Sequence, residues 1–162
     1  MSKKVFVIGC SLEGLSTSIY LLSSGFKVII LEQKDSLIED SLEFKSLLQK
    51  AKSKGVIILR SQNAKRILVD KFFRVESVLT DLREYCCHYI ISCLGRTETI
   101  TTLLKEKNFI DIHPQRIRSF KYHKLYFCRM PEGDEQGKVE QGKTVAQKLI
   151  FDEKLFGKFK IY

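Results

Sequence analysis

Long apolar runs are missing from this sequence, and their absence sets the first limits on what the protein is. No stretch of 18 or more apolar residues occurs, so we expect no membrane-spanning helix and no membrane partner. The chain passes from Lys3 and Lys4 directly into a strand-like run without a separate apolar segment and cleavage site, so we expect no signal peptide. With 44% hydrophobic and 29% charged residues, the composition is typical of a globular protein, which we expect in the cytoplasm.

Cysteine pairs with the spacing of a metal site or a redox centre are also missing. The five cysteines are odd in number and include no C-x-x-C motif, which argues against a metal cluster and against a redox-active dithiol. We therefore predict buried, reduced thiols and no metal ion. These cysteines are Cys10, Cys86, Cys87, Cys93 and Cys128.

Groups for acid–base catalysis are scarce as well. The three histidines, His88, His113 and His123, are scattered, and none forms a recognisable pattern with a carboxylate or a serine. Each is interpreted as a structural residue, and the catalytic residues stay unknown.

Positive charge is plentiful but unevenly placed. The net charge is +9, and because residues 1–40 contain four Lys/Arg and five Asp/Glu (a net of −1), the rest of the chain carries +10. Residues 45–74 alone hold nine basic residues and one acidic residue, a pattern that fits nucleic acid or an acidic partner chain. We favour a solvated lysine-rich helix face and expect no nucleic acid, because aromatic residues do not interleave the lysines as a stacking platform requires.

The order of apolar runs along the 162 residues predicts one α/β domain: a Rossmann-like parallel sheet flanked by helices, with a small antiparallel excursion. No internal repeat or low-complexity linker divides it. The domain is expected at residues 1–151, followed by a basic C-terminal tail at 152–162. Strands are expected at 4–9, 27–32, 56–59, 89–94, 109–112 and 124–128. The antiparallel excursion is expected at 65–82, with a turn near Asp70 and Lys71. Helices are expected from Glu13 and at 41–54, 100–107 and 141–151, and the last of them is expected to turn Val145, Leu149 and Phe156 inward.

The stretch VFVIGCSLEGLSTSIY, residues 5–20, carries the clearest chemical signal. A strand ends at Gly9, an amphipathic helix follows, and Glu32 ends the next strand, near the offset of about 20 residues that a dinucleotide site uses. In that pattern the pyrophosphate rests on backbone N–H groups at the helix N-terminus, and the carboxylate accepts hydrogen bonds from ribose hydroxyls. Ser11 stands where the middle glycine of G-x-G-x-x-G belongs, so we expect a usable but weakened phosphate cradle.

Two questions about the cofactor follow from Glu32. A carboxylate at this position repels a 2′-phosphate, so NAD or the adenosine half of FAD is expected rather than NADP, although Lys34 softens the repulsion. The alternative, that Glu32 is only a polar residue at a strand end, stays open. The candidate cofactor-binding residues of this region are Gly9, Cys10, Ser11, Leu12, Glu13, Gly14, Glu32, Gln33 and Lys34.

Three stretches resemble the pyridine-nucleotide-binding domain of the two-domain flavoprotein oxidoreductases, the group that includes thioredoxin reductase and NADH oxidase. They are VFVIGCSLEGLSTSIYLLSSGFKVIILE, FKSLLQKAKSKGVIIL and YIISCLGRTET. The resemblance adds Gly95 and Arg96 to the candidate cofactor-binding residues, with Thr97 and Glu98 in place of the family's usual Pro–Asn. It implies NAD or FAD as cofactor and hydride transfer to a flavin, which would sit on a partner chain because this chain has room for one dinucleotide domain.

The resemblance thins towards the C-terminus. The family has a Gly-Asp pair whose aspartate contacts the flavin, and Arg129 and Met130 stand at that place after Cys128. Two functions therefore stay open: an NAD(H)- or FAD-binding oxidoreductase-like domain, or a non-catalytic relic that serves as a binding or interaction module. A flavin-carrying or acidic partner chain and a homo-oligomer stay open too.

Overall fold

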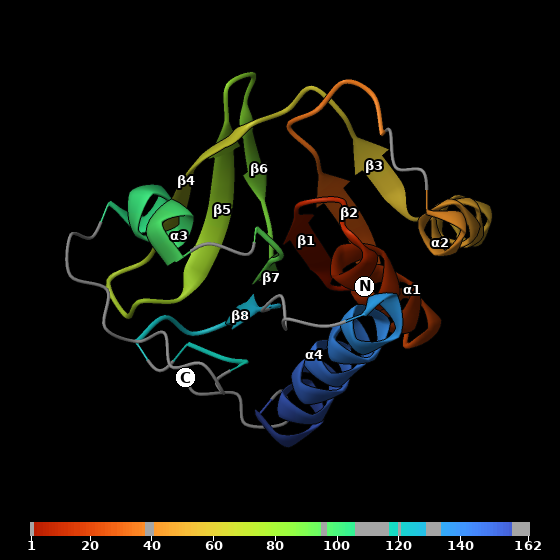
Figure 1. The fold of residues 1–162 in the computed structure, drawn as a ribbon. Helices are drawn as coiled ribbons and strands as arrows, with labels where there is room; N and C mark the ends of the chain where they lie inside the picture. The colour runs from red at the N-terminus through yellow and green to blue at the C-terminus, as the bar shows by residue number, and fades with distance from the viewer. Residues whose placement is uncertain are drawn as a thin grey trace.

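The computed structural model describes residues 2–37, 41–94, 97–105, 117–119, 121–128 and 134–156. The chain forms three layers (Figure 1): a parallel five-stranded sheet lies between helices on one face and a small antiparallel sheet with one helix on the other. The predicted fold class, a Rossmann-like parallel sheet with an antiparallel excursion, is confirmed.

The parallel sheet has the strand order β3-β2-β1-β7-β8, and its strands lie where the apolar runs predicted them. Because its central strands are covered on both faces, they read as continuous apolar runs. The central strand β1 pairs with β2 on one side and with β7 on the other, so the strand order reverses between β1 and β7. Ligands bind at such a reversal, outside the carboxyl ends of the strands. The strands are β1 (Lys4–Ile8), β2 (Lys27–Leu31), β3 (Ile57–Leu59), β7 (Tyr89–Ser92) and β8 (Leu125–Phe127).

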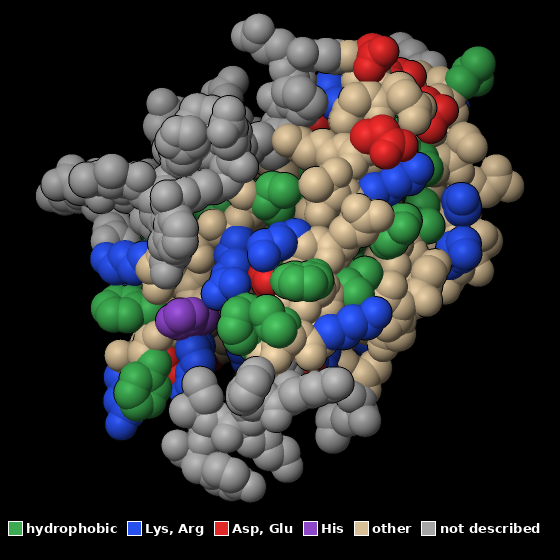
Figure 2. Space-filling view, turned by 90° about the horizontal axis from the view of Figure 1, so that it is seen from below, with side chains coloured by type: hydrophobic (Ala, Val, Ile, Leu, Met, Phe, Trp, Pro, Cys, Tyr) green, Lys and Arg blue, Asp and Glu red, His purple; other side chains and the backbone are tan. Residues whose placement is uncertain are grey.

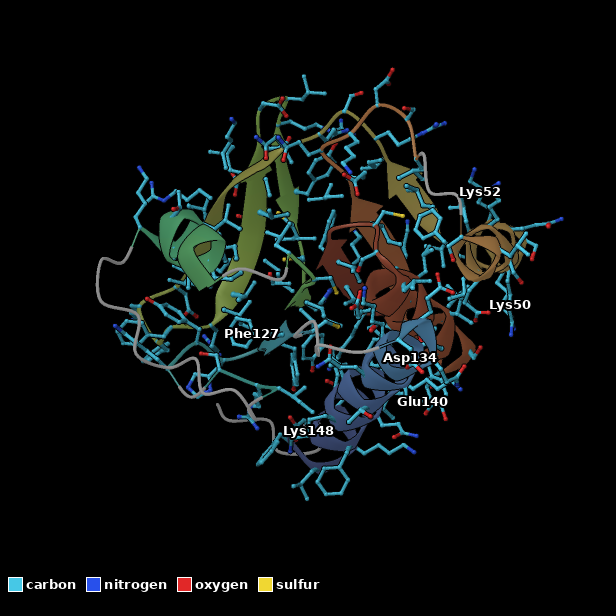
Figure 3. The ribbon with its side chains drawn as sticks, viewed as in Figure 1. Lys50, Lys52, Phe127, Asp134, Glu140 and Lys148 are labelled. Atoms are coloured by element: carbon cyan, nitrogen blue, oxygen red, sulfur yellow. The ribbon has the colours of Figure 1, made fainter. Side chains whose placement is uncertain are left out.

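Three helices pack on one face of the sheet: α1 (Leu12–Ser23), α2 (Leu42–Lys54) and α4 (Glu135–Phe156). The helix α2 turns Phe44 and Ala51 into the core and its lysines to solvent, as expected for a solvated lysine-rich face. Lys50 and Lys52 point away from the sheet (Figure 3).

The closing helix α4 is longer than predicted. It begins before residue 141 because the side chain of Asp134 accepts a hydrogen bond of 2.9 Å from the N–H of Gly137, an interaction typical of a helix start. It also continues past residue 151 into the segment expected as a basic tail. Val145 and Leu149 face the core as predicted, but the prediction for Phe156 is wrong: its side chain is exposed and lies beside the guanidinium of Arg118.

The opposite face of the sheet carries β4 (Ala64–Val69), β5 (Val75–Thr80), β6 (Glu84–Cys86) and the helix α3 (Thr97–Leu104). The antiparallel pair β4–β5 and its turn were predicted; the third strand β6 was not, because its three residues have no apolar pattern. The prediction that no aromatic residue interleaves the basic segment is wrong at the β4–β5 turn, where Phe72 and Phe73 stand between Lys71 and Arg74.

Several predicted features lie outside the described residues. These are the strand at 109–112, the tail beyond residue 156, Gly95, Arg96, His113, Arg129 and Met130. None of the helices in the described part of the chain has the length and hydropathy that a membrane crossing requires.

Candidate dinucleotide-binding site

The turn from β1 into α1 requires glycine at two positions. Gly9 has a φ of +104°, and a Cβ there would lie 3.0 Å from the carbonyl oxygen of Cys93. At Gly14, a Cβ would lie only 2.4 Å from the carbonyl oxygen of Gly9, a backbone atom that cannot move aside. The first turn of α1 is therefore held close against the end of β1, as in a dinucleotide-binding turn.

Ser11 is the N-cap of α1 and not an obstruction inserted into the turn. Its backbone is extended, and its Oγ accepts a hydrogen bond of 3.2 Å from the N–H of Gly14. The N–H groups of Leu12 and Glu13 have no acceptor within the helix, because they belong to its first turn. Ser11 thus occupies one donor of the predicted anion cradle and leaves these two.

Glu32 links the glycine turn to the end of β2. Its Oε2 accepts a hydrogen bond of 2.8 Å from the N–H of Cys10, and its Oε1 accepts one of 2.9 Å from the N–H of Lys34. A carboxylate offers about four acceptor positions, so roughly half of its capacity remains for ligand hydroxyls. The side chains of Gln33 and Lys34 are exposed; Lys34 takes part through its backbone.

The carboxylate of Glu13 is a feature that the sequence analysis did not anticipate. Glu13 lies in the first turn of α1, is 1% exposed, and its Oε1 has no hydrogen-bond partner among the described residues. Glu13 therefore holds an enclosed carboxyl group in the first turn of α1, the helix whose N-terminus forms the predicted phosphate cradle.

This burial results from the close approach of α4 to the start of α1. A Cβ at Gly142 would lie 2.5 Å from the carbonyl oxygen of Glu13, so the two helices meet almost backbone to backbone. Hydroxyls of α1 bind the backbone of α4: Thr17 donates to the carbonyl of Gly142 at 2.9 Å, and Ser16 donates to that of Val139 at 2.6 Å. The small residues of both segments were the available sequence signal.

Three cysteines lie just after the carboxyl ends of β1, β7 and β8, and all three are buried: Cys10, Cys93 and Cys128. Burial, together with a hydrogen bond to Cys128, raises the pKa of the Cys93 thiol well above its ordinary value. A protonated, enclosed thiol is a packing group and a poor nucleophile.

The other two cysteines lie next to each other after β5. Burial, and to a smaller extent the neighbouring Cys86, raises the pKa of the Cys87 thiol to about 12. The prediction of buried thiols is wrong for Cys86, which is exposed because it lies on the short strand β6 of the antiparallel sheet. Within the described ranges, no group of three His, Cys, Asp or Glu side chains has the arrangement of a metal site.

The two described histidines lie away from the glycine turn, at the amino ends of the parallel strands. His88 directly precedes β7, and its Nδ1 accepts a hydrogen bond of 3.0 Å from the N–H of Lys4. His123 precedes β8, and its N–H donates to the carbonyl of Phe73 at 2.8 Å. Neither can take part in chemistry at the carboxyl ends of the strands.

Comparison with known proteins identifies the fold. No protein-family model matches the chain, and no curated protein matches it by sequence. The structure is similar to that of THI4 from Thermovibrio ammonificans, with a TM-score of 0.74 and 14% identity over 94% of this chain and 90% of that chain. The fold is Rossmann-like.

Two further similar structures are larger proteins. One is a variant of 2-methyl-3-hydroxypyridine-5-carboxylic acid oxygenase (TM-score 0.50, 13% identity, 56% of this chain and 39% of that chain). The other is the anhydrotetracycline hydroxylase OxyS from Streptomyces rimosus (TM-score 0.50, 15% identity, 59% of this chain and 32% of that chain). This chain therefore spans well under half of either protein. At such identities the similarity establishes the fold, and activity must be argued from the site.

Proposed function

We propose that this chain binds an adenine dinucleotide at the carboxyl ends of β1 and β7, with the pyrophosphate at the N-terminus of α1. The observation that carries the proposal is the backbone contact at Gly14, which leaves no room for a side chain and sets the first turn of α1 against the end of β1. The N–H groups of Leu12 and Glu13, reinforced by the helix dipole, are the donors for the phosphate oxygens.

Glu32 fits the ribose of such a ligand. It directly follows β2, the strand next to β1, and its carboxylate retains acceptor capacity after binding two backbone N–H groups. The same negative charge opposes a 2′-phosphate, so NAD(H) or FAD is preferred over NADP(H).

FAD is the favoured cofactor. The similar structures include an oxygenase and a hydroxylase, and among the cofactors that Rossmann-type sites hold, flavin is the one that performs oxygen chemistry. When bound, the flavin would supply the redox chemistry, and the residues of this chain would hold and orient it. The resemblance to two-domain flavoprotein oxidoreductases supports a second form, in which NAD(H) binds here and passes hydride to a flavin on a partner chain.

A non-catalytic binding module is the alternative, and two observations favour it. Ser11 already occupies the N–H of Gly14, which removes a donor from the cradle. Glu13 puts an enclosed carboxyl group in the first turn of α1, the helix end proposed for the pyrophosphate, and a carboxylate near this end opposes an anionic ligand.

Calorimetric titration of the purified chain with FAD, NADH, NADPH and ADP-ribose tests the proposal, together with an absorption spectrum of the protein as isolated. We expect FAD and ADP-ribose to bind more tightly than NADPH. If none of the four binds at millimolar concentration, the proposal is wrong and the chain is a relic of a dinucleotide-binding domain.

A further inference from the structure

An exposed aromatic pair stands at the turn between β4 and β5. The side chains of Phe72 and Phe73 are adjacent in sequence and are 56% and 47% exposed. Two neighbouring half-exposed phenyl rings form an apolar patch, and an apolar patch rimmed by charged residues is typical of an interaction surface. We call Phe72 and Phe73, together with Lys71 and Arg74, the aromatic tip.

The turn is built to keep its shape. The Oδ1 of Asp70 accepts hydrogen bonds from the N–H groups of Phe72 at 2.8 Å and of Arg74 at 2.9 Å, and its Oδ2 accepts one from the Arg74 Nε at 2.7 Å. Phe73 has a φ of +58°, a left-handed conformation that bulky residues rarely adopt. The two rings are therefore held in place by a hydrogen-bonded turn.

Cations surround the two rings. The Nζ of Lys71 lies 5.0 Å and the Cζ of Arg74 lies 5.2 Å from the ring centre of Phe72, and the Nζ of Lys121 lies 5.4 Å from that of Phe73. Figure 2 shows this end of the molecule from below, with hydrophobic side chains (green) interspersed with lysines and arginines (blue).

Positive charge continues from the tip to the amino edge of the parallel sheet. Partial burial and then the nearby charges of Lys3 and Arg74 hold the pKa of the Lys124 ammonium below its ordinary value. Among the described residues, Asp70 pairs with Arg74 and Glu153 pairs with Lys3. Like charges held this close repel one another, and an anionic surface relieves the repulsion.

We propose that the aromatic tip docks on an anionic lipid surface, with Phe72 and Phe73 inserted among the headgroups and the lysines and Arg74 against lipid phosphates. Aromatic rings ringed by Lys and Arg are the combination that binds the interface of a charged bilayer. Single-stranded nucleic acid fits less well, because bases stack on ring faces and a lysine or arginine already lies over a face of each ring.

The position of the tip agrees with this role and is independent of the proposed function. A backbone β-bridge pairs Arg74 with His123, next to the start of β8, so the tip lies at the amino ends of the parallel strands. The glycine turn lies at their carboxyl ends, so docking would leave that turn open to solvent. The expectation of no membrane partner rested on the missing spanning run, and contact with a bilayer surface requires no such run.

Vesicle co-sedimentation of the full chain tests the proposal. We compare vesicles of phosphatidylcholine alone with vesicles that contain phosphatidylserine, and we use a double variant, Phe72→Ser with Phe73→Asn. Asn tolerates the left-handed conformation, so this variant should fold. The matched control is Phe151→Ser on α4, an exposed phenylalanine that also has a lysine, Lys148, over its ring.

The wild type and the Phe151 control should bind phosphatidylserine vesicles and not phosphatidylcholine, and salt should weaken binding. The double variant should bind at least about tenfold more weakly, as expected for two lost apolar anchors. The charge-reversal variant Lys71→Glu with Lys121→Glu, which keeps both rings, should lose binding too. Absent binding by the wild type, equal binding by the double variant, or binding of a single-stranded oligonucleotide in place of vesicles would each overturn the proposal.

Discussion

The backbone N–H of Cys10, inside the glycine turn, donates a hydrogen bond of 2.8 Å to the Oε2 of Glu32 at the end of β2. Through this bond Glu32 ties the turn to the neighbouring strand before any ligand arrives. The residue therefore has a structural role in addition to the proposed contact with ribose, and the two roles can be separated by experiment.

Glu32→Ala should weaken both the fold and the site. It leaves the N–H groups of Cys10 and Lys34 without their acceptor, which should lower the free energy of unfolding by about 1–3 kcal/mol, and it should weaken NADH binding by about 1–2 kcal/mol. Urea unfolding and calorimetric titration measure the two effects. Lys34→Ala, which removes only an exposed side chain, is the control and should leave stability unchanged; unchanged binding in Glu32→Ala would mean that this carboxylate does not contact the ligand.

Replacing Ser11 separates capping from phosphate binding. Ser11→Ala removes the cap and should destabilise the protein by about 1 kcal/mol, whereas Ser11→Gly should cost only a few tenths of that. Both changes free the N–H of Gly14, so Ser11→Gly should tighten dinucleotide binding, and Gly14→Val should abolish it by forcing α1 off β1. Thermal melting and titration of the three variants provide the comparison; weaker binding by Ser11→Gly would show that the hydroxyl itself contacts the phosphate.

The contact between α1 and α4 can be tested with two glycines of the same helix. Gly142→Ala places a Cβ 2.5 Å from the carbonyl oxygen of Glu13 and should destabilise the fold by about 1–3 kcal/mol. Gly137→Ala meets only the side chain of Asp134, at 3.3 Å, and should be neutral or stabilising by up to about 1 kcal/mol. Equal melting temperatures for the two variants would contradict the close helix packing.

His88 should make the protein less stable in mild acid. Partial burial, and then the charges of Lys124, Lys3 and Lys4, hold the pKa of His88 below its ordinary value of about 6.5. At a pH between the pKa of His88 in the folded chain and its ordinary value in the unfolded chain, the unfolded chain binds a proton at His88 and the folded chain does not. This contribution to stability is therefore present above pH 6.5 and is lost as the pH falls towards the folded pKa. Melting curves between neutral and mildly acidic pH should show a decline that His88→Gln reduces; an unchanged decline would assign it to other groups.

The layered architecture was readable in the sequence because burial on both faces imposes continuous apolar runs, as in β1, β2 and β7. The start of α4 was misread, because glycines and acidic residues around Asp134 look like a loop until the capping bond is seen. Strand β6 was missed, since three residues carry too little pattern.

The candidate site was predictable in outline but not in its bonds. The spacing of Gly9, Gly14 and Glu32 follows from the steric needs of the turn, and those needs are visible in a one-dimensional pattern. The capping by Ser11 is a local bond to Gly14, three residues on, and it was missed because the motif led us to expect a glycine at that position. The burial of Glu13 depends on contact with α4, which is far away in sequence. Pairings between distant segments leave little local signal, so the structure was needed to find them.

Amide chemical shifts measured by NMR during titration with ADP-ribose test the central claim most directly. We predict that the largest changes fall on the backbone N–H groups of Leu12 and Glu13, with smaller changes at Gly14, whose N–H binds Ser11, and at Cys10 and Lys34, whose N–H groups bind Glu32. In Gly14→Val these changes should vanish. Changes confined to residues outside the β1–α1 turn, or none at millimolar ligand in both the native chain and Ser11→Gly, would contradict a dinucleotide site at this turn.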